Sequence, residues 1–239
     1  MLLLETCVDS VEGALAAVAG GTDRIELCSA LEVGGLTPSL GQMRAAAALP
    51  VPVHALIRSR AGDFCFGPDE VAAMIVDIGT ARDAGLAGVV LGAALADGRL
   101  DLAALGAMRA AAGSMSVTLH RVFDLVPDPA AALEGAVTLG FDRILTSGGA
   151  RSAPEGAEAI ARLVTRARGR IGILPAAGLT SANLADFLGL VPVGEVHSAC
   201  GRDVAMASRA VEMEFCHATR LVTDVDEVRA MRAILSARS

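Results

Sequence analysis

The sequence predicts a closed (β/α)8 barrel that occupies the whole chain, residues 1–239, as one domain. Short apolar segments alternate with helical segments eight times, which implies parallel strands joined by crossover helices. Polar residues collect at the ends of nearly all these strands, and no linker or change in composition divides the chain. An open doubly wound sheet is the alternative, but the glycine pattern GxGxxG does not follow the first strand.

The stretch Gly20–Ser39 shows how one unit is built. Gly20 and Gly21 are suited to end a helix, because glycine tolerates the left-handed backbone of a C-terminal cap. A strand over Arg24–Cys28 would place Glu26 and Cys28 on one face, because side chains alternate along a strand. Thr37 and Pro38 then predict the start of the next helix.

The other units follow the same order along the chain. The predicted strands are Leu2–Thr6, Arg24–Cys28, Val51–Ile57, Ala87–Leu91, Ser116–His120, Asp142–Leu145, Ile171–Leu174 and Gly194–His197. The predicted helices are Val11–Ala19, Pro38–Ala48, Asp69–Ala84, Asp101–Ala112, Asp128–Leu139, Glu155–Ala167, Ser181–Leu188 and Asp224–Ser236. Ser198–Thr223 is expected to be one long irregular loop, of the kind that forms lids or binding segments.

Composition excludes several classes of function. A net charge of −7 and the lack of a basic patch argue against a nucleic-acid partner. All twenty basic residues are arginine, so chemistry that needs a lysine Schiff base is excluded. Five cysteines without a tight pair do not suggest a disulfide framework, and the short apolar N-terminal run is neither a signal peptide nor a membrane span. We therefore expect a cytoplasmic protein with no membrane partner.

Ionisable side chains recur at equivalent strand ends. In a barrel of this kind the active site lies at the carboxyl ends of the strands, so these groups should meet at one mouth. Isolated strand-end carboxylates can also be structural partners of arginines, but a converging set favours a functional site. The inward-facing set comprises Glu5, Cys7, Glu26, Cys28, His54, Arg58, Thr118, His120, Thr146, Glu195 and His197.

Two late loops have the composition of anion sites. Thr146, Ser147, Gly148 and Gly149 lie between a strand and a helix, where free backbone N–H groups favour phosphate or carboxylate. The same argument applies to the loop with Gly178 and Thr180. The alternative is that Gly178 and Thr180 form only a tight turn and a helix cap.

Cys7 and Cys28 are expected at the ends of adjacent strands, which lie about 4.8 Å apart. Two thiolates so placed are suited to hold Cu(I) in a near-linear geometry, or to bind zinc together with His120 or His197. The alternative is that both cysteines pack as small hydrophobic residues.

Long ordered motifs between Leu2 and about Ala199 resemble the copper homeostasis protein CutC family. They are ETCVDSVEGALAAVAGGTDRIELCSALEVGGLTPS, VPVHALIRSRAGDFCF, TLHRVFD, RILTSGG and EVHS. The resemblance implies a cytoplasmic TIM-type barrel, a homo-oligomer, a link to copper and Cu(I) ligation by Cys7 and Cys28. Departures include Ala176 and Ala177, where a glycine-rich turn is common. The matching mouth residues are Glu5, Glu26, His54, Arg58, Arg60, Asp63, His120, Arg121, Asp124 and His197.

Two functions are therefore expected. The first is Cu(I) binding or buffering through Cys7 and Cys28. The second is a lysine-independent isomerase, lyase or hydrolase that acts on a small anionic or phosphorylated metabolite, with Arg58 and Arg121 as its clamp. For this enzyme, the expected catalytic residues are Glu5, Glu26, His54, Arg58, His120, Arg121, Asp124 and His197. The expected anion-binding residues are Arg60, Thr146, Ser147, Gly148, Gly149, Gly178 and Thr180.

Overall fold

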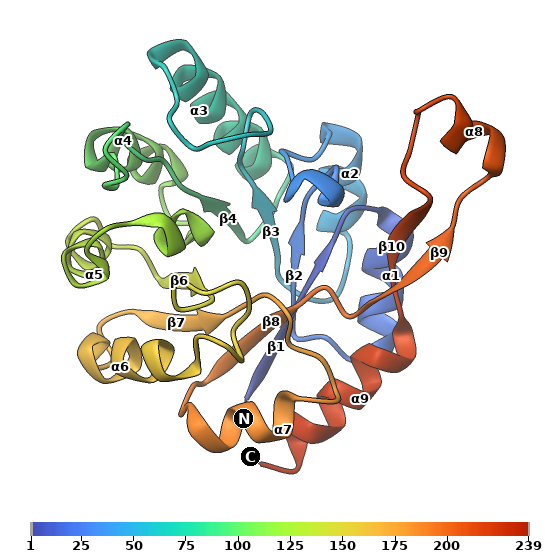
Figure 1. The fold of residues 1–239 in the computed structure, drawn as a ribbon. Coiled ribbons are helices and arrows are strands. Elements are labelled where there is room, and N and C mark those ends of the chain that lie inside the picture. Colours follow the sequence, from blue (N-terminus) through green and yellow to red (C-terminus); the bar gives the residue numbers. More distant parts are fainter. Residues whose placement is uncertain (1, 239) are drawn as a thin grey trace.

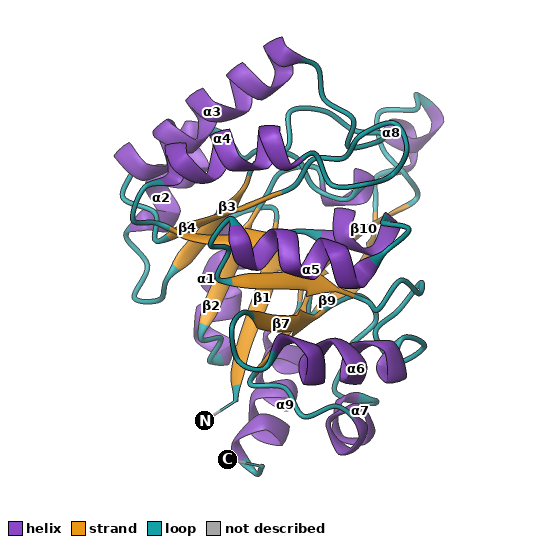
Figure 2. Ribbon diagram, turned by 90° about the vertical axis from the view of Figure 1, so that its left-hand side faces the viewer, coloured by secondary structure: helices purple, strands orange, loops and turns teal. Residues whose placement is uncertain are grey.

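The computed structural model describes residues 2–238 and confirms the predicted barrel. Its eight strands form one parallel sheet in the order β7-β6-β5-β4-β3-β2-β1-β8. Strands β7 and β8 are therefore the two end strands of the sheet, and the barrel closes between them. Helices surround the sheet on its outer side (Figures 1 and 2). The first and last helices that the structure describes lie side by side, and Arg232 donates a hydrogen bond to the Leu2 carbonyl at 2.9 Å (Figure 1).

The elements follow the predicted alternation. The barrel strands are β1 (Leu3–Val8), β2 (Arg24–Leu27), β3 (Val53–Leu56), β4 (Gly88–Leu91), β5 (Ser116–Leu119), β6 (Arg143–Thr146), β7 (Gly172–Pro175) and β8 (Glu195–Ser198). The outer helices are α1 (Val11–Gly20), α2 (Leu40–Ala47), α3 (Pro68–Asp83), α4 (Leu102–Ala112), α5 (Pro129–Thr138), α6 (Ala157–Ala167), α7 (Leu184–Leu190) and α9 (Val225–Ser236). Short 3-10 helices, η1 (Leu31–Val33) and η2 (Arg121–Leu125), follow β2 and β5.

Helix α2 begins two residues later than predicted. Ser39, rather than Thr37, is its N-cap, because Ser39 and Gln42 exchange hydrogen bonds between side chain and backbone. Thr37 is instead tied to the third strand unit, where its hydroxyl accepts a hydrogen bond from the Arg58 backbone N–H at 3.0 Å. Residue Gly21, with φ of 92°, ends α1 as predicted.

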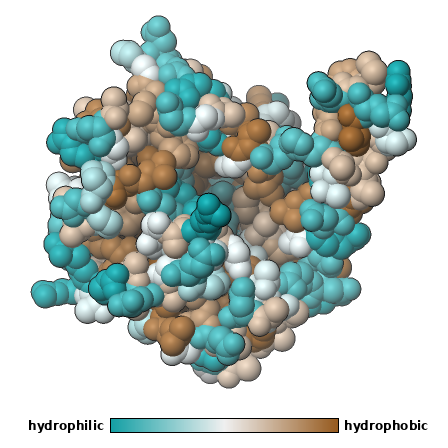
Figure 3. Space-filling model, viewed as in Figure 1, coloured by the Kyte–Doolittle hydropathy of each residue, from teal (hydrophilic) through white to brown (hydrophobic). Residues whose placement is uncertain are grey.

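The segment expected to be an irregular loop, Ser198–Thr223, is instead largely a hairpin arm. Strands β9 (Gly201–Ala205) and β10 (Thr219–Thr223) pair antiparallel, and α8 (Ser208–Glu212) lies between them. The arm projects from the barrel wall (Figures 1 and 3). Its strands are mostly exposed, so they lack the apolar alternation by which a strand is recognised in a sequence.

The main hydrophobic core lies between the sheet and the helices. Outward-facing strand residues such as Leu4, Ile25 and Val89 are fully buried there. Helix residues Met74 and Met108 pack into the same cluster. The core is therefore aliphatic, as the near-absence of aromatic residues requires, and it leaves the inside of the barrel free for polar groups.

Two strand glycines, and a third that directly follows β4, make room for these inner polar side chains. A Cβ atom at Gly88 would lie 2.6 Å from His54, and one at Gly92 would lie 2.3 Å from His120. At Gly172 the nearest atom would be a carboxylate oxygen of Glu195, at 2.8 Å.

We predict that Gly88→Ala destabilises the protein by about 1–3 kcal/mol, because the new methyl group overpacks against His54 and the Ser116 carbonyl. Gly189→Ala is the control, since Gly189 is exposed on α7 and nothing lies within 4 Å of its Cβ position. Urea denaturation of both variants measures the difference. Equal stabilities would contradict the steric argument.

Candidate functional site

The carboxyl ends of the strands surround a cavity of about 700 Å³. The face shown in Figure 3 is hollowed at its centre. Among the predicted residues that line this cavity are Cys7, Glu26, Arg58, His120, Arg121, Gly178, Thr180 and His197. The groups expected from strands one, two, three, five and eight therefore do meet at one mouth.

A buried charge network centred on Glu5 lies inside the barrel. The Glu5 carboxylate is fully buried, forms an ion pair with Arg24, and lies 2.7 Å from Nδ1 of His197. Arg24 also binds Glu195 at 2.6 Å, and Arg143 binds the other oxygen of Glu195 at 3.3 Å. The interior of the barrel is thus crossed by ion pairs rather than filled by branched aliphatic side chains.

The network fixes the protonation of its members. Burial alone would raise the pKa of Glu5, but the hydrogen bond with His197 and the charge of Arg24 hold it well below its ordinary value. Burial opposes protonation of His197, yet its hydrogen bond to Glu5 raises its pKa.

Sequence analysis missed Arg24 and Arg143. Arg24 lies two residues before Glu26 and therefore shares its inward face. Arg143 lies three residues before Thr146, which was wrongly expected to face inward; Leu145, two residues after Arg143, lines the mouth cavity instead.

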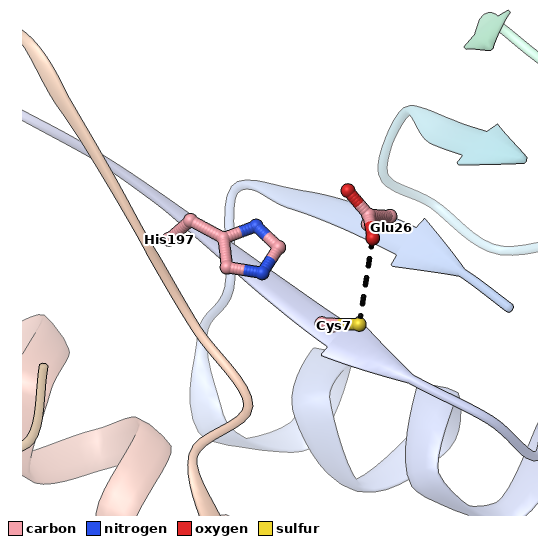
Figure 4. Close-up of side chains that lie close together, drawn as sticks. All are labelled: Cys7, Glu26 and His197. Carbon is pink, nitrogen blue, oxygen red and sulfur yellow. Dashed lines mark hydrogen bonds between the residues drawn. The ribbon is translucent and has the colours of Figure 1, made fainter. Parts of the chain in front are cut away.

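Cys7, Glu26 and His197 form a buried cluster (Figure 4). Each offers one possible ligand atom, and these three atoms lie within 4.8 Å of one another. The Cys7 thiol is 3.6 Å from Oε1 of Glu26. Burial, together with the negative charge of Glu5, raises the pKa of Glu26 to about 6. The pKa of Cys7 is raised by contact with Cys28 and by burial.

Cys28 is the second thiol at this end of the barrel. Its sulfur lies 4.0 Å from that of Cys7, and the side chain is fully buried. Leu56 and Val90 pack beside the two cysteines. The predicted closeness of the two sulfurs is therefore present in the fold.

The two histidines of β3 and the β5 end are neutral. Burial lowers the pKa of His54 to about 4, and burial together with Arg58 lowers that of His120 to about 3. Nδ1 of His120 accepts a hydrogen bond from the Val122 backbone at 3.1 Å, so the proton of the neutral ring resides on Nε2. Within residues 2–238, that Nε2 and Nδ1 of His54 are buried without a hydrogen-bond partner.

Arg58 is not free to clamp a ligand in the expected way. Its guanidinium donates to the backbone carbonyls of Val33, Gly35 and Gly62 at 2.9, 3.0 and 2.7 Å. It also stacks 4.9 Å from the Phe64 ring centre. Through these contacts Arg58 holds the loop after β2 and the loop after β3 together at the mouth.

Arg60 points away from the cavity that it was expected to serve. Its side chain pairs with Glu70 at 2.5 Å and with Asp63 at 3.0 Å, and it also donates to the Cys65 carbonyl. Neither Arg60 nor Asp63 is among the residues that line the mouth cavity.

The first predicted anion loop is filled by a carboxylate of the protein itself. Asp124 accepts hydrogen bonds from the backbone N–H groups of Ser147 and Gly149 and from the Thr146 hydroxyl at 3.0, 3.1 and 2.5 Å. Arg121 pairs with the same carboxylate at 2.8 Å and donates to Ser147. The donors that were expected to hold an external anion are therefore engaged, and Asp124 is their partner rather than a free catalytic acid.

The second predicted anion loop is also satisfied internally. The Thr180 N–H donates to the Asn183 side chain at 3.0 Å, and Gly178 has a φ of 74°. The N–H and hydroxyl of Ser181 donate to Glu227 at 2.6 and 2.7 Å. The geometry thus matches the alternative of a tight turn closed at a helix start.

Together, the fold and the site define a (β/α)8 barrel protein with a buried Cys/Glu/His cluster at its mouth. The model of the CutC family matches residues 2–202, and the chain belongs to this family. A CutC family protein of Sinorhizobium medicae is 55% identical over 237 residues, 99% of this chain and 97% of the relative. The human copper homeostasis protein cutC homolog is 42% identical, over 97% of this chain and 88% of its own length.

Solved structures agree with this assignment. A CutC protein from Streptococcus agalactiae aligns with a TM-score of 0.80 at 29% identity, over 83% of this chain and 99% of its own. Phosphoribosylanthranilate isomerase from Thermotoga maritima aligns with a TM-score of 0.59 at 16% identity, over 99% of this chain and 100% of its own. The second likeness establishes the barrel fold alone.

We predict that Glu5→Gln lowers the free energy of unfolding at pH 7 by about 1.5–3 kcal/mol, because Arg24 loses one of its two carboxylate partners and His197 loses its hydrogen-bonded carboxylate, while Glu195 still pairs with Arg24. The pKa of Glu5 is depressed in the fold, so its contribution is complete above the ordinary carboxyl pKa and is lost as the pH falls. The difference between parent and variant should therefore narrow from pH 5 to pH 3 in urea titrations.

Glu134→Gln is the matched control, because Glu134 pairs with Arg170 on the exposed surface. This variant should change stability little at either pH. An equally small effect of Glu5→Gln would show that the inner network contributes nothing to folding.

Proposed function

We propose that the chain binds Cu(I) at the barrel mouth through Cys7 and Cys28 and buffers it in the cell. The observation that carries this proposal is the pair of buried thiols 4.0 Å apart on adjacent strands, next to a cavity. Cu(I) prefers soft thiolate ligands. The name of the human relative, copper homeostasis protein cutC homolog, supports a link to the same metal.

The sulfur separation also indicates how the ion would be held. Two metal–thiolate bonds of roughly 2.3 Å would span about 4.6 Å in a straight line. The observed 4.0 Å between the sulfurs of Cys7 and Cys28 instead favours a bent arrangement, without movement of either strand. This differs from the near-linear geometry expected from the sequence.

A reducing compartment and a homo-oligomer remain part of the proposal. All five cysteines are free, which suits a thiol site in the cytoplasm. No helix in residues 2–238 has the length and hydropathy to cross a membrane. Phe215 on the hairpin arm is 82% exposed, and such an apolar side chain is suited to contact a second copy of the chain.

We predict that Cys7→Ala and Cys28→Ala each weaken Cu(I) binding by more than about 100-fold, because each removes a sulfur that bonds the ion directly. Competition with a chromophoric Cu(I) chelator under anaerobic conditions measures the affinity. Cys65→Ala, in a loop outside the mouth, should bind as the parent does. Full binding by the double variant Cys7→Ala/Cys28→Ala would refute the assignment.

Acid–base catalysis on a small metabolite is a second candidate, favoured by Glu26 and His120. A carboxyl group with a pKa near 6 beside a cavity is suited to transfer a proton near neutral pH. The neutral His120 ring, with its proton on Nε2, is suited to donate a hydrogen bond to a substrate oxygen. Arg121 lines the cavity and is 41% exposed, so it is the cation best placed to meet a substrate carboxylate.

We expect a small carboxylate that occupies the mouth to raise the melting temperature of the parent, and Glu26→Gln or Arg121→Ala to abolish that shift. A thermal-shift screen of carboxylate metabolites measures this effect. Arg99→Ala is the control, because Arg99 pairs with Asp97 on the exposed surface. Stabilisation that persists in both mouth variants would place the ligand elsewhere.

A further inference from the structure

Glu26 differs from the other carboxylates inside the barrel because it has no cationic hydrogen-bond partner. Glu5 pairs with Arg24, while Glu195 pairs with Arg24 and Arg143. Among residues 2–238, Oε1 of Glu26 meets only the Cys7 thiol, and its Oε2 is buried with no hydrogen-bond partner. A buried carboxylate is costly unless a cation or a proton compensates it. The position is therefore suited to take up either a proton or a cation.

The imidazole of His197 is already oriented as a metal-binding histidine. Its Nδ1 is 2.7 Å from the fully buried Glu5 carboxylate, which leaves Nε2 as the nitrogen available for another partner. Metal-bound histidines commonly use one ring nitrogen for the ion and give the other to a carboxylate. Figure 4 shows this ring on β8 facing Cys7 on β1 and Glu26 on β2.

The spacing of the three side chains fits a tetrahedral ion. Zinc bound to sulfur at about 2.3 Å and to a carboxylate oxygen at about 2.1 Å holds these two atoms roughly 3.6 Å apart. The Cys7 sulfur and Oε1 of Glu26 are 3.6 Å apart. One ring nitrogen of His197 lies within 4.8 Å of both atoms, against roughly 3.4–3.6 Å in a tetrahedral site, so a side-chain movement of at most about 1.4 Å would complete the contact.

We propose that Cys7, Glu26 and His197 bind a divalent cation of the zinc class, with a fourth coordination position open to the mouth cavity. One sulfur, one oxygen and one nitrogen form a mixed donor set, which suits zinc better than Cu(I). Three protein ligands with an open fourth position are the arrangement of zinc sites that bind an exchangeable ligand. All three residues line the cavity of about 700 Å³.

The divalent site stands independently of the Cu(I) proposal, because Cys28 takes no part in it. The two sites share Cys7 only, so each metal should exclude the other. Substitutions at the unshared residues therefore separate the two proposals, and the failure of one leaves the other intact.

The experiment is a titration of the metal-free, reduced full-length chain with Co²⁺, followed by displacement with Zn²⁺. The parent should show the intense visible bands of tetrahedral Co²⁺ and a sulfur-to-cobalt charge-transfer band. Glu26→Gln and His197→Gln should each weaken Zn²⁺ binding at least 10-fold and leave Cu(I) binding within threefold of the parent. Cys28→Ser should weaken Cu(I) binding and leave Zn²⁺ binding unchanged. Cys7→Ser should abolish the sulfur-to-cobalt charge-transfer band.

The Glu26→Gln variant should fold as the parent does, because glutamine has the same shape as glutamate and the substitution removes an unpaired buried charge. Its melting temperature should equal or exceed that of the parent, so a loss of Zn²⁺ binding reports on the ligand. The proposal is overturned if the parent binds no Co²⁺ or Zn²⁺. It is also overturned if Zn²⁺ affinity requires Cys28 or is indifferent to Glu26→Gln.

Discussion

The ion-paired interior of the barrel is the constraint on which the rest of the site depends. Glu5 is fully buried and would be costly there without Arg24 and His197. The same contacts fix the ring of His197 and place a negative charge close to Glu26. One buried carboxylate thus sets both the stability of the inner layers and the electrostatics of the mouth above them.

This interior also explains the composition of the strands. Gly88, Gly92 and Gly172 stand where a Cβ atom would clash with an inner polar side chain. The hydrophobic stabilisation comes instead from the layer between the sheet and the helices. Because the aliphatic layer outside the sheet supplies the hydrophobic core, the space inside the barrel can hold ionisable side chains.

The order of strands and helices could be predicted from the sequence because hydrophobic periodicity and turn-forming residues are local signals. Parity along the strands also placed Cys7, Glu26 and His197 on the inner face, and the fold brings them together. The hydrogen-bond partners of Arg58 and Asp124 could not be predicted, because they lie on loops that are distant in the sequence and meet only in the folded chain. The hairpin arm was missed because its exposed strands carry no apolar face.

The closed state of the two late loops has a consequence for selectivity. Asp124 and Glu227 occupy the amide donors that similar loops in other barrels offer to phosphate groups. Abundant phosphate esters in a cell would have to displace a covalently tethered competitor to enter there. The amide donors of Ser147, Gly149 and Ser181 are therefore engaged by tethered carboxylates, whereas Cys7, Glu26 and His197 remain in the wall of the cavity.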